Sequence, residues 1–154
     1  MKSKTALASG LLLVMLAVVP LYALAAHRSS EEEAVAMLQK AVAYMDEHGD
    51  VAAFEAFNDP DGEFIKGDLY VFVFDMEGNY RASGANPKLV GSSVLDLTDV
   101  EGNPVFEKML EVTKDKGEGS VEYVWLNRQT NQVEDKSSHI QKVGDNIVGV
   151  GHYD

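Results

Sequence analysis

The chain has 154 residues, of which 25 are acidic and 13 basic, so its formal net charge is −12. Such an acidic chain is a poor match to nucleic acid or to an anionic membrane surface. It contains no cysteine, which excludes disulfides, thiolate nucleophiles and thiolate metal sites.

The first 25 residues have the pattern of an export signal. Lys2 and Lys4 form a basic start, Leu7 to Val19 is an apolar run, and Ala23-Leu24-Ala25 fits a signal-peptidase site. We expect cleavage after Ala25, which gives a periplasmic or secreted protein whose single domain covers residues 26–154. The alternative is an uncleaved membrane anchor, although the apolar run is short for a spanning helix.

Helical signals come next in the chain. Ser30 is a good N-cap, and Glu33 stands at the capping-box position. Apolar residues then recur at helical spacing, namely Val35, Leu38, Val42 and Met45. His48-Gly49 is predicted to end this helix, and Asp50 to cap a second one that runs to Phe57.

The centre of the chain is the stretch from Leu69 to Phe74, which is all aromatic, β-branched or leucine. Alternation places Leu69, Val71 and Val73 on one face of a strand, and Tyr70, Phe72 and Phe74 on the other. Both faces are apolar, which predicts a central strand covered on both sides. A turn at Gly78-Asn79 should return the chain as a shorter strand over residues 80–83.

A long apolar loop follows from Gly84 to Leu97. A helix is predicted to start with Asn103 as N-cap and Pro104 as its first residue, and to end at Gly117. Three strands are predicted after it, over residues 119–126, 133–143 and 147–153, the last two joined by a tight hairpin. The order of elements predicts an α+β domain on a five-stranded antiparallel sheet.

Four segments together resemble the single Cache domain family, the extracytoplasmic relatives of the PAS sensor fold. They are Gly67 to Asp75 followed by Gly78, Gly84 to Gly91, Tyr123 to Asn127, and Lys136-Ser137-Ser138 with Val148 to Gly151. The resemblance implies a PAS-like sheet with a long N-terminal helix on one face and a ligand pocket on the other. Ser83 departs from the pattern, because many relatives carry histidine there.

The resemblance implies a sensor for a small organic ligand, most often a small carboxylate or an amino acid, in signal transduction or chemotaxis. We expect a standalone exported member, since no second transmembrane helix or output module follows in this sequence. The implied partners are the ligand and a membrane receptor or histidine kinase, and the apolar N-terminal helix offers a face for a homodimer. The alternative is an interaction module with a closed, packed core.

Six residues are candidates for ligand binding: Tyr123, Trp125, Lys136, Asn86, Tyr70 and His139. Tyr123 and Trp125 share one strand face and line either a pocket or the core. Lys136 is either an exposed anchor for a carboxylate at the pocket rim or a solvated surface lysine. Asn86 either hydrogen-bonds the ligand or shapes a turn.

Two further readings bear on chemistry. Gly149 and Gly151 remove side chains from one strand face, which leaves room for a ligand or allows close backbone packing. The four histidines lack metal-ligand spacing, and no nucleophile elbow, phosphate loop or zinc-protease motif is present. We therefore expect neither an enzyme nor a metal or cofactor site.

Overall fold

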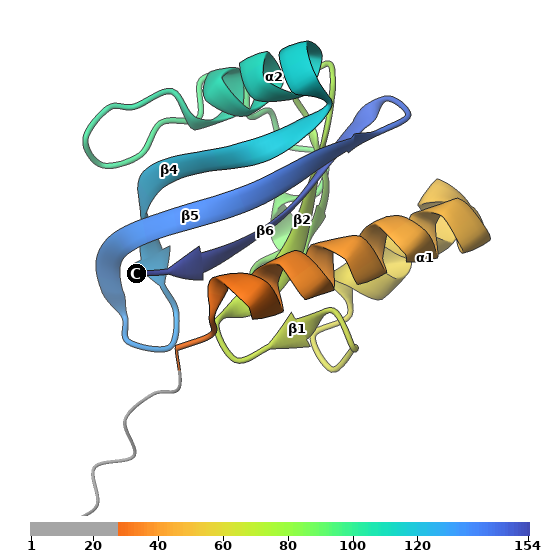
Figure 1. Ribbon diagram of the computed structural model, residues 1–154, viewed down its shortest axis with the longest axis horizontal. Helices are drawn as coiled ribbons and strands as arrows, with labels where there is room; N and C mark the ends of the chain where they lie inside the picture. The colour runs from red at the N-terminus through yellow and green to blue at the C-terminus, as the bar shows by residue number, and fades with distance from the viewer. Residues whose placement is uncertain (1–27) are drawn as a thin grey trace, which may run out of the picture.

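The computed structural model describes residues 28–154, so the predicted signal peptide lies outside the described part. Two helices, α1 (Glu31–Asn58) and α2 (Val105–Lys116), lie on opposite faces of one antiparallel sheet (Figure 1). The predicted α+β architecture, with a long N-terminal helix across one face, is confirmed. No helix within residues 28–154 has the length and apolar character needed to cross a membrane.

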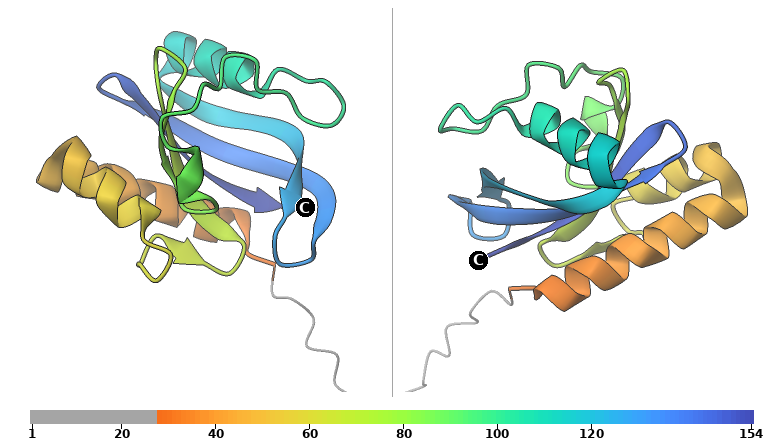
Figure 2. Two further views of the ribbon diagram at one scale, coloured as in Figure 1. Left: turned by 180° about the vertical axis from the view of Figure 1, so that it is seen from behind. Right: turned by 45° about the horizontal axis from the view of Figure 1, so that its top comes forward.

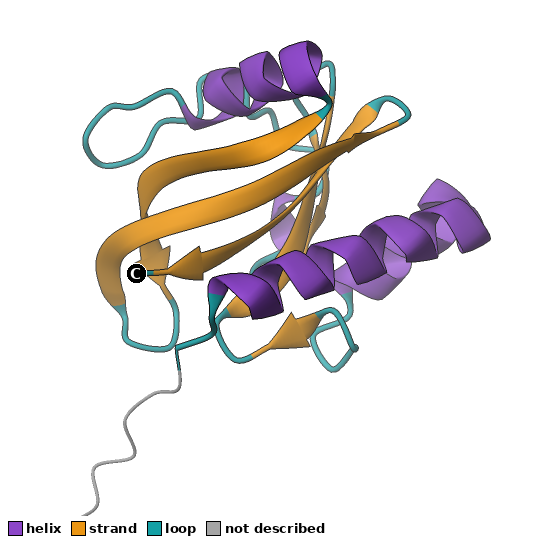
Figure 3. Cartoon of the chain, in the orientation of Figure 1, coloured by secondary structure: helices purple, strands orange, loops and turns teal. Residues whose placement is uncertain are grey.

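The sheet has six strands rather than the predicted five (Figure 3). They are β1 (Ile65–Lys66), β2 (Leu69–Asp75), β3 (Tyr80–Ser83), β4 (Glu118–Asn127), β5 (Gln132–Val143) and β6 (Asn146–Tyr153). The order is β1-β2-β6-β5-β4, with β3 also paired to β2. The additional strand, β1, has only two residues, too few to show any alternation in sequence.

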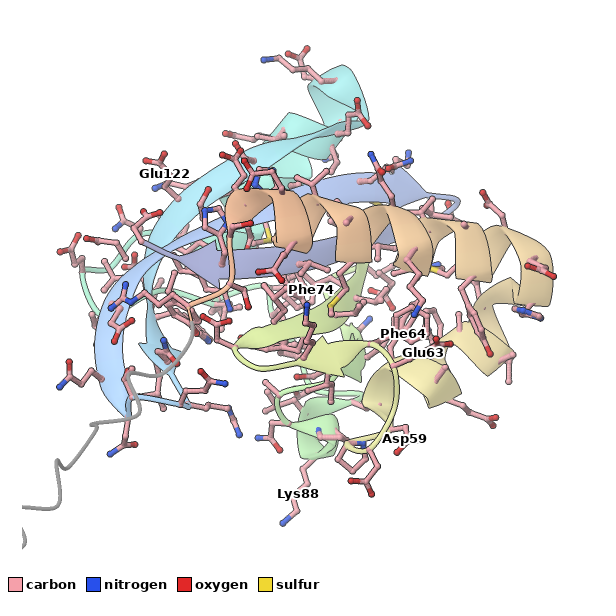
Figure 4. All side chains as sticks on the ribbon, turned by 60° about the horizontal axis from the view of Figure 1, so that its bottom comes forward. Asp59, Glu63, Phe64, Phe74, Lys88 and Glu122 are labelled. Atoms are coloured by element: carbon pink, nitrogen blue, oxygen red, sulfur yellow. The ribbon has the colours of Figure 1, made fainter. Side chains whose placement is uncertain are left out.

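The two faces of β2 belong to two separate cores, as the alternation predicts. Leu69, Val71 and Val73 pack with the buried face of α1, whereas Phe72 and Phe74 pack with α2, β4 and β5. Phe64, just before β1, closes the first core beneath α1, with its ring 4.7 Å from that of Phe57 (Figure 4). The sheet therefore has a helix-covered core on each side, and the α2 side holds the cavity described below.

The N-terminal helix forms as its signals predict. The Ser30 hydroxyl accepts a hydrogen bond from the Glu33 backbone, and the Glu33 carboxylate accepts one from Ser30 N, which completes the capping box. Gly49, where the first helix was predicted to end, has φ 78° and ψ 167°, and the helix kinks there before continuing to Asn58. The two predicted helices are thus the two segments of α1 on either side of this kink.

The start of α2 differs by one residue from the prediction. Asn103 was expected at the N-cap, but the cap position is Pro104 and the helix begins at Val105. The Asn103 side chain is engaged elsewhere: its amide nitrogen donates to the Asp99 carboxylate at 2.9 Å, and its oxygen, the atom that would cap the helix, accepts from Lys108 Nζ at 3.4 Å. The predicted end is correct, since Gly117 takes the left-handed conformation with φ 79°.

The glycines of β6 allow close packing of side chains. A Cβ atom at Gly149 would collide with the Phe72 ring, and one at Gly151 would collide with the Lys136 side chain and the Ser138 hydroxyl. This outcome differs from both readings of the sequence, because side chains of β2 and β5, rather than a ligand or a neighbouring backbone, occupy most of the space. The space over β6 is filled by the protein's own side chains.

Candidate ligand-binding cavity

A cavity lies between the α2 face of the sheet and the loop that follows β3. Its empty space, including the open mouth, is about 510 Å³. The walls come from β2, β3, α2, the end of β4 and the loop containing a short 3₁₀ helix, η1 (Pro87–Leu89). The helix α2 and the loop that contains η1 lie on the same side of the sheet in the two views of Figure 2. The predicted pocket on the face opposite α1 is therefore present.

The cavity has an apolar part and a polar part. The apolar lining is made by Phe72, Phe74, Leu89, Leu97, Val105 and Met109. The polar lining is made by Tyr70, Tyr80, Ser83, Asn86, Tyr123, Trp125 and Arg128. Strand register places Tyr70, Ser83 and Trp125 toward one end of the sheet. This arrangement suits a small molecule with one polar end and an apolar body.

Tyr123 and Trp125 both line the cavity, as one of their two readings predicts. Their rings pack edge to face with centroids 5.7 Å apart. The Tyr123 hydroxyl lies 2.8 Å from the Ser138 hydroxyl, so its polar tip has a partner within the protein. Tyr123 therefore contributes a fixed aromatic wall.

Arg128 is the one charged residue among those lining the cavity, and it was not among the candidates predicted from the sequence. It follows β4 directly and is exposed at the mouth. Within residues 28–154, no carboxylate lies within ion-pair distance of its guanidinium. The only feature of the sequence that could have indicated this position was a basic residue just after the strand that carries Tyr123 and Trp125.

Lys136 is not the exposed residue that the sequence analysis expected. It is 1% exposed, and it pairs with Tyr123 across β4 and β5 on the cavity side of the sheet. Its Nζ donates to the Tyr70 hydroxyl at 2.8 Å and lies 3.4 Å from the Tyr153 hydroxyl. Lys136 is absent from the cavity lining, but its amine contacts the hydroxyl of Tyr70, which does line the cavity.

Burial is the main influence on the ionisation of this group. It lowers the pKa of Lys136 to about 7, with the Arg128 charge acting in the same direction and Asp68 opposing it. Burial also raises the pKa of Tyr70 to about 12. At neutral pH a neutral phenol thus stands beside a lysine that is close to its titration point.

Asn86 and His139 lie on opposite sides of the sheet. Asn86 lines the cavity at the start of η1, where its backbone N donates to the Ser83 carbonyl at 3.0 Å. His139 lies on the other face of the sheet, stacked on His152 at 5.7 Å and with Nε2 3.5 Å from a Glu31 carboxylate oxygen. The structure therefore brings Tyr70, Asn86, Tyr123 and Trp125 together, places Lys136 behind them, and separates His139 from them.

The described residues contain no group of three or more histidine, aspartate or glutamate side chains arranged to hold a metal ion. The cavity provides one cation, several hydrogen-bonding groups and an apolar wall.

Comparisons with known proteins give a matching family model and a curated relative. The family model described as single Cache domain 2 matches residues 13–154. The sensor histidine kinase MctS of Rhizobium johnstonii is 33% identical over 88 residues, which are 56% of this chain but only 19% of that kinase.

Solved structures share the fold. A methyl-accepting chemotaxis protein from Vibrio parahaemolyticus matches with a TM-score of 0.68 at 21% identity, over 79% of this chain and 86% of that one. A Cache chemosensory domain solved for its carboxylic acid recognition matches with a TM-score of 0.68 at 23% identity, over 79% and 91%. The periplasmic sensor domain of a chemotaxis protein matches with a TM-score of 0.62 at 23% identity, over 79% and 88%.

Proposed function

The chain belongs to the single Cache domain 2 family, and on that premise we propose that it is an exported sensor domain for a small monocarboxylate. The observation that carries the proposal is Arg128, a cation with no ion-pair partner in the described chain, at the mouth of a cavity with apolar walls. From the sequence, Lys136 was the candidate cation for binding the carboxylate. We now assign it to Arg128.

Charge and lining together favour an acid with one carboxylate and an apolar body. A guanidinium binds a carboxylate through two parallel N–H···O bonds, and such charge-assisted contacts are strong. A second carboxylate or an ammonium group would be placed against apolar side chains such as Phe74, Val105 and Met109, where an unpaired charge is unfavourable. The Cache domain solved for carboxylic acid recognition supports this class of ligand by analogy.

The loop after β3 would hold the ligand in place. Its second half is tied to β3, with Gly91 N donating to the Tyr80 carbonyl and Tyr80 N donating to the Ser92 carbonyl. Its first half, which carries Asn86 and Leu89, lines the cavity. A shift of this first half over the bound acid is the closing step that we propose, and the closed form would be read by a membrane receptor or histidine kinase.

A thermal-shift screen tests the proposal directly. The library contains straight-chain monocarboxylates, dicarboxylates and amino acids, each at millimolar concentration. A ligand at 100 times its Kd adds about 2.7 kcal/mol of stability, which should raise the Tm by roughly 10 °C for a domain of this size. We expect monocarboxylates to give the largest shifts. A flat response across the library would instead favour an interaction module.

A further inference from the structure

Lys136 is a buried amine without a carboxylate partner, although it lies beside the proposed carboxylate site. The residue is 1% exposed, and its Nζ contacts two phenol hydroxyls, those of Tyr70 and Tyr153. The same nitrogen lies over both rings, 4.2 and 4.6 Å from their centroids. Within residues 28–154, no carboxylate is in ion-pair range of this nitrogen. A charged ammonium is therefore only weakly compensated in this position.

The charged and titratable groups around Lys136 come from strands β2, β4 and β6 and from the segments beside β2 and β4. Asp68, in the turn before β2, attracts the ammonium, but its own oxygens accept hydrogen bonds from Ser29 N at 3.2 and 3.4 Å. Arg128, after β4, repels it. The phenols of Tyr70, Tyr123 and Tyr153 are neutral at physiological pH, because burial raises the pKa of each.

These opposing effects leave the amine close to balance. Burial and the Arg128 charge favour the neutral amine, whereas Asp68 and the two ring faces favour the ammonium. The result is a pKa of about 7, so one additional charge nearby decides which form is present. Arg128 lies at the cavity mouth and Tyr70 in the cavity wall, so a ligand that contacts both changes this balance directly.

We propose that binding of a carboxylate in the cavity is coupled to the uptake of one proton by Lys136. This inference rests on the function proposed above. The ligand's negative charge offsets that of Arg128 and stabilises an ammonium behind the Tyr70 hydroxyl. A proton passes from solvent to the Lys136 nitrogen, and no other bond forms or breaks. Above neutral pH the affinity should then fall by up to tenfold per pH unit, until the lysine remains neutral in the complex as well.

Calorimetric titration measures the proton directly. The probes are straight-chain monocarboxylates from acetate to hexanoate, titrated at pH 8 in phosphate and in Tris, two buffers with different ionisation enthalpies. A group with a pKa of about 7 is about nine-tenths neutral at pH 8, so the difference in heat should correspond to about 0.9 proton per bound acid. Lys136→Met should reduce the uptake to zero. The control is Lys88→Met, which removes an exposed lysine of η1 that points away from the body of the molecule (Figure 4). This variant should take up the same number of protons as the wild type.

A second measurement does not depend on the variant's folding. The pH titration of lysine side-chain carbon signals in the wild-type protein, followed by NMR, should show one lysine near 7 without acid and well above 8 with acid bound. The coupling is wrong if all lysine signals titrate near 10.4. It is also wrong if an acid binds with the same heat in both buffers. Either result leaves the proposed function standing. Failure of every acid in the series to bind overturns both.

Discussion

The carboxylate of Asp99 and the backbone of Val124 are joined across the edge of the sheet by a hydrogen bond of 3.2 Å. Val124 belongs to β4, next to Trp125 of the cavity wall, and Asp99 lies in the loop that leads to α2. The same carboxylate accepts hydrogen bonds from the backbones of Glu101 and Asn103 and from the Asn103 amide. Burial opposes ionisation of Asp99, but these hydrogen bonds prevail and lower its pKa to about 2.

Replacement of Asp99 should therefore make the free energy of unfolding less sensitive to pH in the acid range. Its pKa falls from 3.8 to about 2 on folding, which corresponds to about 2 kcal/mol of stability. Because the folded pKa is the lower one, this stability is present above about pH 4 and is lost as the pH falls toward 2. We expect Asp99→Asn to be less stable than wild type at pH 6, with the difference narrowing at pH 2.5, in urea titrations at both pH values.

The control for this experiment is Asp96→Asn, which removes an exposed carboxylate from the same loop. It should leave the unfolding free energy within about 0.5 kcal/mol of wild type. An Asp99→Asn variant that behaves like the control would mean that the Asp99 carboxylate does not hold the loop to β4.

Arg128→Gln should weaken the binding of monocarboxylates without loss of fold stability. A charge-assisted contact contributes about 1.5–3 kcal/mol, so the Kd should rise roughly 10- to 150-fold. The ligand-free Tm should hardly change, because this side chain is exposed and has no ion-pair partner within residues 28–154. Arg81→Gln removes an exposed arginine that pairs with Asp75 and is absent from the cavity lining, so it serves as the control. Equal affinity for all three proteins would place the anion elsewhere.

Gly149→Ala should destabilise the domain through the Phe72 ring. The new methyl group would overlap this buried ring, and overpacking of this kind typically costs about 1–3 kcal/mol. Phe72→Leu alone should also destabilise, but it makes room at position 149. The double variant should therefore be more stable than the sum of the two losses predicts, in a double-mutant cycle measured by urea denaturation. Simple additivity would show that the two positions do not share this space.

The histidine pair under α1 should give the fold a second pH dependence. Burial lowers the pKa of His139 below 6.5, with the Glu31 charge opposing and the His152 charge reinforcing this effect. Since the unfolded chain takes up the proton first, stability is highest above about pH 6.5 and falls as the pH drops below it. His139→Gln should flatten the loss of stability between pH 7.5 and 5. His48→Gln, at an exposed position of α1, should retain the full dependence.

Local signals predict most of this fold. The two apolar faces of β2, the capping box of α1 and the glycines at positions 78, 117 and 144 each act within a few residues, and each feature forms where expected. The two-residue strand β1 carries no such signal. The start of α2 was predicted one residue early. The Asn103 side chain is engaged by Asp99, four residues before it, and the residue types alone do not show which of the two local contacts Asn103 makes.

The site was harder to predict because charge and burial depend on neighbours that are distant in sequence. Lys136 is buried because β2 and β6 place two tyrosines beside it, and an isolated strand gives no hint of this. Arg128 resembles any surface arginine until the fold brings it to the cavity mouth. The aromatic residues Tyr123 and Trp125 were easier, since their alternation alone defines a shared face.

The missing side chain at Gly151 links three positions in evolution. A methyl group there would occupy the space of both the Lys136 side chain and the Ser138 hydroxyl, so the glycine cannot gain a side chain while these two residues stay as they are. In descendants of a common ancestor, a larger residue at the glycine position should arise only together with smaller residues at positions 136 and 138. An alignment of homologues should therefore keep this glycine wherever the lysine is kept.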